Sequence, residues 1–220
     1  MNKVIYIAIL IFASIVNAQT AEEIVAKHFD VTGGYEQWNA LSSITIEAEV
    51  AIGVSDVAPL LIEHKRPYFK RVSYIIDGQE KLNEGFDGKH GYTYDENNHK
   101  FKRLARYEPD AFETDLLNYK KKGFKVKLEG TEKINGKETY KIELTKNTVQ
   151  DYYWIDVKSY QLIKEVNAIE TIYYKDLRKF EGLTFATRME IKPHRGAEYV
   201  LIFNDIKPNA SIPEARFKFN

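Results

Sequence analysis

The sequence contains no cysteine among its 220 residues. Disulfides, thiolate nucleophiles and cysteine-based zinc sites are therefore excluded, and the core alone must hold the fold together. An excess of one charge is also missing, since 32 Lys and Arg stand against 32 Asp and Glu. Both signs are mixed along the chain, which argues against nucleic-acid binding because that function needs a one-sided basic face.

Recognisable catalytic and metal-binding motifs are missing as well. No G-x-S-x-G nucleophile elbow occurs. Asp87 and Asp95 could form the carboxylate pair of a glycoside hydrolase, but Asp87 precedes Gly88 and is explained equally well as a turn residue. Metal-ligand spacing is not reached by any of the five histidines, which are His28, His64, His90, His99 and His194. We predict that the protein is not an enzyme and uses no metal or cofactor.

Long apolar runs are missing except at the start. Val4 to Ile15 is apolar, Lys3 precedes it, and small residues surround a possible cut before Gln19. Residues 1–18 are therefore predicted to be a secretory signal peptide. No other run approaches the ~20 residues of a membrane span. We expect residues 19–220 to form a single exported domain that is soluble, periplasmic and monomeric.

The chain is rich instead in short segments with alternating apolar residues. From Ile44 to Ile52 every second residue is apolar, which predicts a half-buried strand. Asp77-Gly78 and Asn135-Gly136 are strong hairpin signals, whereas the region from Ile52 to Leu60 reads poorly as a strand because of Pro59. Further strands are predicted at 60–65, 69–76, 81–86, 90–95, 99–104, 124–134, 137–144, 152–157, 160–166, 169–174, 183–191 and 199–206.

Helical signals are few. Thr20 and Glu23 fit a capping box that starts a helix ending at Gly33-Gly34, and a short helical turn with Trp38 follows. Pro109-Asp110 is predicted to open an internal helix that Gly123 ends. Its apolar face consists of Phe112, Leu116 and Tyr119.

These elements predict a mainly β (α+β) fold, in which a large curved antiparallel sheet forms an incomplete barrel covered by two or three helices as a lid. So much single-faced strand under so little helix can leave an apolar concavity suited to a lipid. Aromatic pairs such as Tyr152 and Trp154 could stack on sugars instead, although aromatics are more often simply good strand formers.

The stretch from Ile62 to Tyr94 contains Lys65-Arg66-Pro67, an aromatic-rich strand, then Asp87-Gly88-Lys89 and an aromatic three residues beyond the lysine. This order resembles the LolA family of periplasmic lipoprotein carriers. The second half is similar to the branch called outer membrane lipoprotein-sorting proteins, through 123–130, 135–138, 152–156, 203–206 and the terminal Phe217-Lys218-Phe219. The Pro-rich tail that many carriers have after the final Phe-x-Phe is absent, so a paralogue with another lipid stays open.

The resemblance implies an apolar cavity that carries the acyl chains of lipoproteins, or another lipid, toward the outer membrane, with no cofactor. It implies an inner-membrane exporter and an outer-membrane acceptor as partners. Arg66 matches the arginine that bonds to the lid helices and governs opening; alternatively, it only closes a strand before Pro67. The expected cavity lining, subject to strand parity, is Ile44, Ile46, Val50, Leu60, Ile62, Val72, Tyr74, Tyr92, Tyr140, Ile142, Leu144, Leu201 and Phe203.

Two other functions remain open at this stage. A lipid-sensing regulatory domain could use the same fold to bind a membrane-anchored partner, although about 200 residues leave little room for a second domain. An enzyme acting on lipids or glycans would need a nucleophile or metal set that the sequence does not display.

Overall fold

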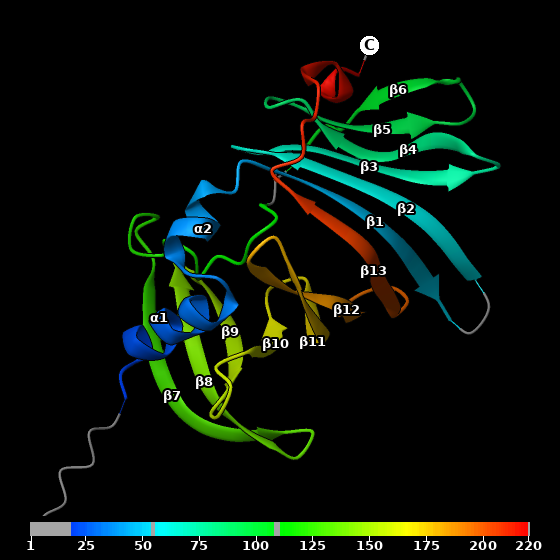
Figure 1. Cartoon of the computed structure of the whole chain (residues 1–220). Coiled ribbons are helices and arrows are strands. Elements are labelled where there is room, and N and C mark those ends of the chain that lie inside the picture. The colour runs from blue at the N-terminus through cyan, green and yellow to red at the C-terminus, as the bar shows by residue number, and fades with distance from the viewer. Residues whose placement is uncertain (1–18, 54–55, 108–110, 220) are drawn as a thin grey trace, which may run out of the picture.

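The computed structural model describes residues 19–53, 56–107 and 111–219. Its centre is one antiparallel sheet of 13 strands in the order β6-β5-β4-β3-β2-β1-β13-β12-β11-β10-β9-β8-β7 (Figure 1). The strands are β1 (Ser43–Ile52), β2 (Asp56–Lys65), β3 (Phe69–Ile76), β4 (Gln79–Phe86), β5 (Gly91–Asp95), β6 (Lys100–Arg103), β7 (Lys125–Ile134), β8 (Lys137–Lys146), β9 (Val149–Asp156), β10 (Leu162–Val166), β11 (Glu170–Phe180), β12 (Leu183–Pro193) and β13 (Tyr199–Pro208).

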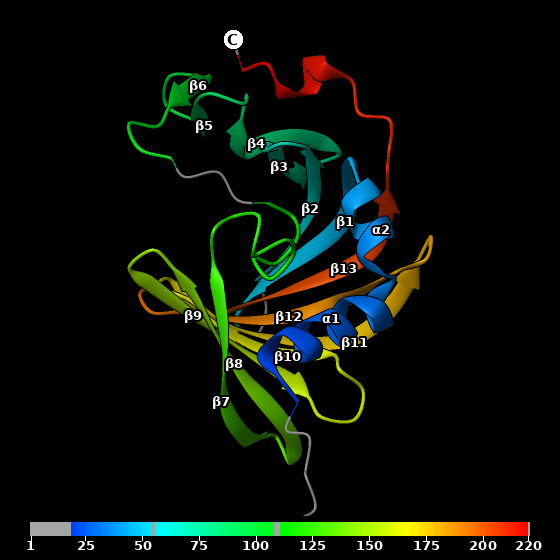
Figure 2. The same cartoon turned by 90° about the vertical axis from the view of Figure 1, so that its left-hand side faces the viewer.

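The sheet consists of two meanders joined at one seam. Strands β1 to β6 follow one another by hairpins, as do β7 to β13, and β1 then pairs with β13. The two edge strands, β6 and β7, are consecutive in the sequence but lie at opposite ends of the strand order. The sheet curves strongly without closing, as Figure 2 shows. The predicted incomplete antiparallel barrel is therefore confirmed.

Two α-helices pack on the inner side of this curve. Helix α1 (Ala21–Thr32) begins with the predicted capping box, since Thr20 Oγ1 accepts from the Glu23 backbone N–H and the Glu23 carboxylate accepts from the Thr20 N–H. Helix α2 (Tyr35–Ala40) carries the buried Trp38. A 3₁₀ turn, η1 (Glu214–Phe217), lies near the C-terminus.

The predicted helix before Gly123 is wrong in the part of it that the structure describes; its expected start at Pro109-Asp110 lies outside the described residues. Residues 111–123 form consecutive turns, which we call the lid segment. Asn118 has a φ of 56°, a left-handed conformation that interrupts a right-handed helix. The Asn118 side chain donates to Oδ1 of Asn39, a residue of α2, so a tertiary contact replaces the helix. Leu116 and Tyr119 are nevertheless buried together, as expected.

Strand β2 is longer than predicted. It begins at Asp56 and includes Pro59, which lies opposite Glu49 of β1. On the other side, the pairing with β3 ends at Leu60 and Tyr74. Pro59 lies beyond the end of this pairing, so the missing N–H of proline costs no ladder hydrogen bond to β3.

The predicted signal peptide, residues 1–18, lies outside the described residues. None of the helices in the described part of the chain has the length and hydropathy that crossing a bilayer requires.

Candidate functional site

The inner face of the sheet, which we define as the face covered by α1, α2 and the lid segment, carries an apolar cluster over its central strands. Ile46 lies opposite Ile62, and Ile62 lies opposite Val72, so these three residues share one face across three strands. This β1–β3 cluster contains Ile44, Ile46, Ala48, Val50, Leu60, Ile62 and Ile206, with Val72, Tyr74, Leu201 and Phe203 packed against it half-buried. The half-buried members leave apolar surface accessible inside the curve.

A second apolar cluster lies under the helices. Ile142 and Leu144 of β8 are completely buried, and Tyr140 packs half-buried beside them. Their cover consists of side chains from α1, α2 and the lid segment, namely Ile24, Val25, Phe29, Trp38, Leu116, Leu117 and Tyr119. Phe112 of the lid segment packs against both clusters. The second cluster is therefore closed by the lid in this structure.

The expected position of Tyr92 is wrong. Tyr92 lies opposite Gly85, which lies opposite Arg71, and this row alternates with the row of Ile62 and Val72. Tyr92 therefore points to the outer face, where its ring packs 5.0 Å from that of Phe219. The C-terminal segment (residues 209–219) covers this part of the sheet, which a sequence pattern of alternation alone cannot reveal.

Arg66 directly follows the last residue of β2 and lies beside α2 and the lid segment. Its guanidinium donates to the carbonyl oxygens of Trp38 at 3.0 Å and Asn39 at 2.8 Å, at the end of α2. The same group lies 3.4 Å from Glu113 Oε1 and 5.4 Å from the ring centre of Phe112. A fixed fork of donors suits this arrangement, because one side chain reaches several carbonyls and a carboxylate at once. Arg66 thus connects the sheet, α2 and the lid segment.

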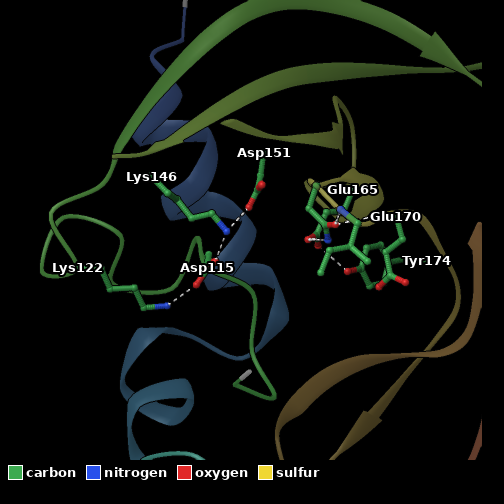
Figure 3. Close-up of polar contacts among 9 residues, drawn as sticks. Asp115, Lys122, Lys146, Asp151, Glu165, Glu170 and Tyr174 are labelled. Atoms are coloured by element: carbon green, nitrogen blue, oxygen red, sulfur yellow. Dashed lines mark hydrogen bonds and ion pairs between the residues drawn. The ribbon is translucent and has the colours of Figure 1, made fainter. Parts of the chain in front are cut away.

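Charged side chains also lie on the inner face, and the sequence analysis did not predict them there. Figure 3 shows Lys146 between two carboxylates. Its Nζ lies 2.7 Å from Asp115 of the lid segment and 2.5 Å from Asp151 of β9. Burial acts to lower the pKa of Lys146, but its hydrogen bonds to both carboxylates leave that pKa above the ordinary value. Asp151 is almost fully buried, and its ion pair with Lys146 offsets the cost of burying a carboxylate.

Glu165 of β10 lies farther along the same face (Figure 3). It accepts a hydrogen bond from the Tyr174 hydroxyl at 2.7 Å and from Asn167 at 3.2 Å. Burial raises the pKa of Glu165, and the negative charges of Asp151 and Asp115 raise it further. A parity argument could have placed Glu165 inside, because it alternates with the outward-facing Lys164.

The inner face ends in a pocket. A cavity of about 380 Å³ lies at the end of β1 and the start of β2, lined by Val50, Ile52, Asp56, Val57, Ala58 and Tyr74. Its lining is mainly apolar, and Val57 is 56% exposed. A second cavity of about 470 Å³ lies between α1 and the lid segment, beside Tyr35, Asn118 and Tyr119. Charged side chains, namely Glu22, Glu23, Lys120 and Lys121, line much of the second cavity. The first cavity therefore suits a small apolar ligand better.

Asp87, considered above for catalysis, and His28, considered above for metal binding, both have structural contacts. Asp87 accepts from the backbone N–H groups of Lys89 and His90 at 2.8 and 2.6 Å, so it is a turn residue. His28 contacts the Tyr160 carbonyl at 2.9 Å, and burial lowers its pKa. Among the described residues, no group of three or more His, Asp or Glu could hold a metal ion.

Comparison with solved structures identifies the fold. A LolA superfamily protein from Nitrosomonas europaea matches with a TM-score of 0.58 and 16% identity, over 91% of this chain and 98% of that one. An outer membrane lipoprotein-sorting protein domain from Vibrio parahaemolyticus gives 0.59 and 13% identity, over 89% and 94%. A DUF1329 family protein from Desulfovibrio piger gives 0.59 and 13%, over 88% and 97%.

No curated protein matches the sequence significantly. Residues 87–220 match the model of a family described as "uncharacterized protein". This match covers more than half of the chain, so the chain belongs to that family, and its fold is LolA-like.

Proposed function

We propose that this protein is a periplasmic carrier that shields the acyl chains of lipoproteins, or of another lipid, on the inner face of its sheet and moves them toward the outer membrane. The observation that carries this proposal is the β1–β3 cluster, an apolar surface on the concave side of an open sheet with a lid beside it. The LolA-like fold supports it, as does the apolar run within residues 1–18, which we interpret as an export signal.

The energetics require such a container. Each methylene of an acyl chain costs about 0.8 kcal/mol to expose, so a chain of about fifteen methylenes costs roughly 12 kcal/mol. The half-buried side chains Val72, Tyr74, Leu201 and Phe203 are the surface available to the first methylenes. Ile142 and Leu144 become available only when the lid moves, because both are fully buried beneath it.

Arg66 is the gating residue of this proposal. Its bonds to α2 and its contact with Glu113 stabilise the closed lid, and the closed lid competes with cargo for the same apolar face. A closed state of this kind lowers the apparent affinity in proportion to its population. Closure therefore favours release, and loss of Arg66 should leave cargo bound.

The test begins with the full chain expressed with its own leader in a Gram-negative host. Native mass spectrometry of the purified protein should show a co-purified lipid, and a fluorescent acylated peptide should bind. Arg66→Leu should fold but release this peptide at least about tenfold more slowly than the unmodified protein. Arg188→Leu is the matched control, because Arg188 pairs at 3.3 Å with Glu190, a residue of the same strand β12.

Two results would count against the proposal. A protein that carries no lipid and binds no acylated peptide would exclude the carrier function. Release from Arg66→Leu at the rate of the unmodified protein would exclude gating by Arg66 while leaving lipid binding intact. The mass of the co-purified species would also separate a lipoprotein from another lipid.

A further inference from the structure

The lid segment carries two carboxylates, Glu113 and Asp115, that contact cations on two distant parts of the sheet. Glu113 lies beside Arg66, directly after β2. Asp115 lies beside Lys146, the last residue of β8. Six strands separate β2 from β8 in the sheet, so the lid segment ties one meander to the other across the concave side.

We propose that Lys146 is a second gating residue, which fastens the lid segment to the β8–β9 wall independently of Arg66. The proposal rests on the carrier function proposed above. It adds a second contact, between Asp115 and Lys146, that must break before the second apolar cluster accepts an acyl chain. Among the described residues, Lys146 and Asp115 form the only ion pair between the lid segment and strands β7 to β12.

The charges around Lys146 allow this contact to break and form again. Asp151 belongs to β9, the neighbour of β8, so Lys146 keeps this partner when the lid segment leaves. Asp115 keeps Lys122, which lies 3.2 Å away and belongs to the lid segment itself. When the lid segment opens, neither Lys146 nor Asp115 is left without a partner. The cost of an unpaired charge in an apolar surrounding is therefore avoided.

The contact is also placed to control access to the second apolar cluster. Leu144 is two residues before Lys146 on the same face of β8, and it lies opposite Asp151. Leu116 and Leu117 follow Asp115 directly and are completely buried against that wall. Release of Asp115 from Lys146 is therefore the local step that lets Leu116 and Leu117 leave the wall.

The test compares Lys146→Met with a matched control, Lys175→Met. Lys175 forms an ion pair of 2.6 Å with Glu190, but both residues belong to the sheet, on β11 and β12. Hydrogen exchange of residues 111–123 is measured by mass spectrometry, and uptake of a fluorescent acylated peptide is measured in parallel. Lys146→Met should raise exchange of the lid segment about three- to tenfold and raise peptide affinity by a similar factor, because the closed state no longer competes. Lys175→Met should change neither.

A second variant keeps the test decisive if Lys146→Met fails to fold. Asp115→Asn removes the same contact from the lid side and should give the same increase in exchange. The double variant should show no more exchange of the lid segment than Lys146→Met alone, because the Asp115–Lys146 contact is the one that both changes remove. Unchanged exchange of the lid segment in both single variants would overturn the proposal. Failure of the unmodified protein to bind the peptide would instead refute the carrier function, and the exchange data would still decide whether Lys146 fastens the lid.

Discussion

Phe219→Ala should destabilise the protein and leave any affinity for the acylated peptide unchanged, because Phe219 anchors the C-terminal segment on the outer face. Phe219 is only 6% exposed. Its ring centre lies 5.0 Å from that of Tyr92 and 5.8 Å from that of Phe101. Gly85 makes room for it, since a Cβ at Gly85 would lie 2.2 Å from the ring.

The magnitude follows from this burial. Truncation of a buried phenylalanine to alanine costs about 3–5 kcal/mol in a core. The site lies near the edge of the sheet and near the end of the chain, where neighbours relax more easily, so we expect a loss of about 2–4 kcal/mol. Arg216 still holds the segment through Glu63 at 2.9 Å and Glu80 at 2.7 Å, which should keep the variant folded.

The assay is urea unfolding followed by tryptophan fluorescence, together with binding of the acylated peptide. Phe203→Ala is the matched control on the inner face. Its loss in the free energy of peptide binding should exceed its loss in the free energy of unfolding. A loss below about 1 kcal/mol for Phe219→Ala would refute the anchoring role. A clear loss of its peptide affinity would refute the assignment of the outer face.

Three further changes have definite expected results. Glu165→Gln should stabilise the protein at pH 8 but not at pH 4, measured by thermal unfolding at both pH values. Burial raises the pKa of Glu165 above its value in the unfolded chain. The wild-type protein therefore loses stability as pH rises through the folded pKa, and glutamine, which does not ionise, avoids that loss. Thr20→Ala should lower the free energy of unfolding by about 1 kcal/mol through loss of the α1 cap, measurable by urea unfolding. Asn118→Ala should raise hydrogen exchange of the lid segment, because alanine tolerates a φ of 56° poorly and cannot bond to Asn39.

The strands were largely predictable from the sequence, because the two-residue period and the turn residues act locally. Ile44 to Ile52 alternate as expected, and Asp77-Gly78 and Asn135-Gly136 turn the chain between strands. The inner face followed from the same alternation for Ile46, Ile62 and Val72. In these segments local preference and tertiary packing agree.

The failures occurred where distant parts of the chain decide the outcome. Tyr92 alternates properly within its strand, but pairing through Gly85 and Arg71 sets its face, and Phe219 covers it. The lid segment has a helical apolar pattern, but a bond from Asn118 to α2 replaces the helix. The contacts of Lys146 were hidden for the same reason, since Asp115 lies 31 positions away in the sequence.

The pairing of β1 with β13 affects the order in which the molecule can fold. Ile46 meets Ile206 across this seam, with about 160 residues between them. Each meander contains mainly neighbouring contacts and can assemble quickly, whereas the seam must wait for nearly the whole chain, and such distant pairings are slow. Until β13 pairs with it, β1 presents an edge of unpaired backbone N–H and C=O groups that is open to aggregation. A chain that crosses a membrane before folding would therefore need to be shielded from aggregation until β13 pairs with β1. During refolding, the backbone amides of this seam should be the last in the sheet to become protected from hydrogen exchange.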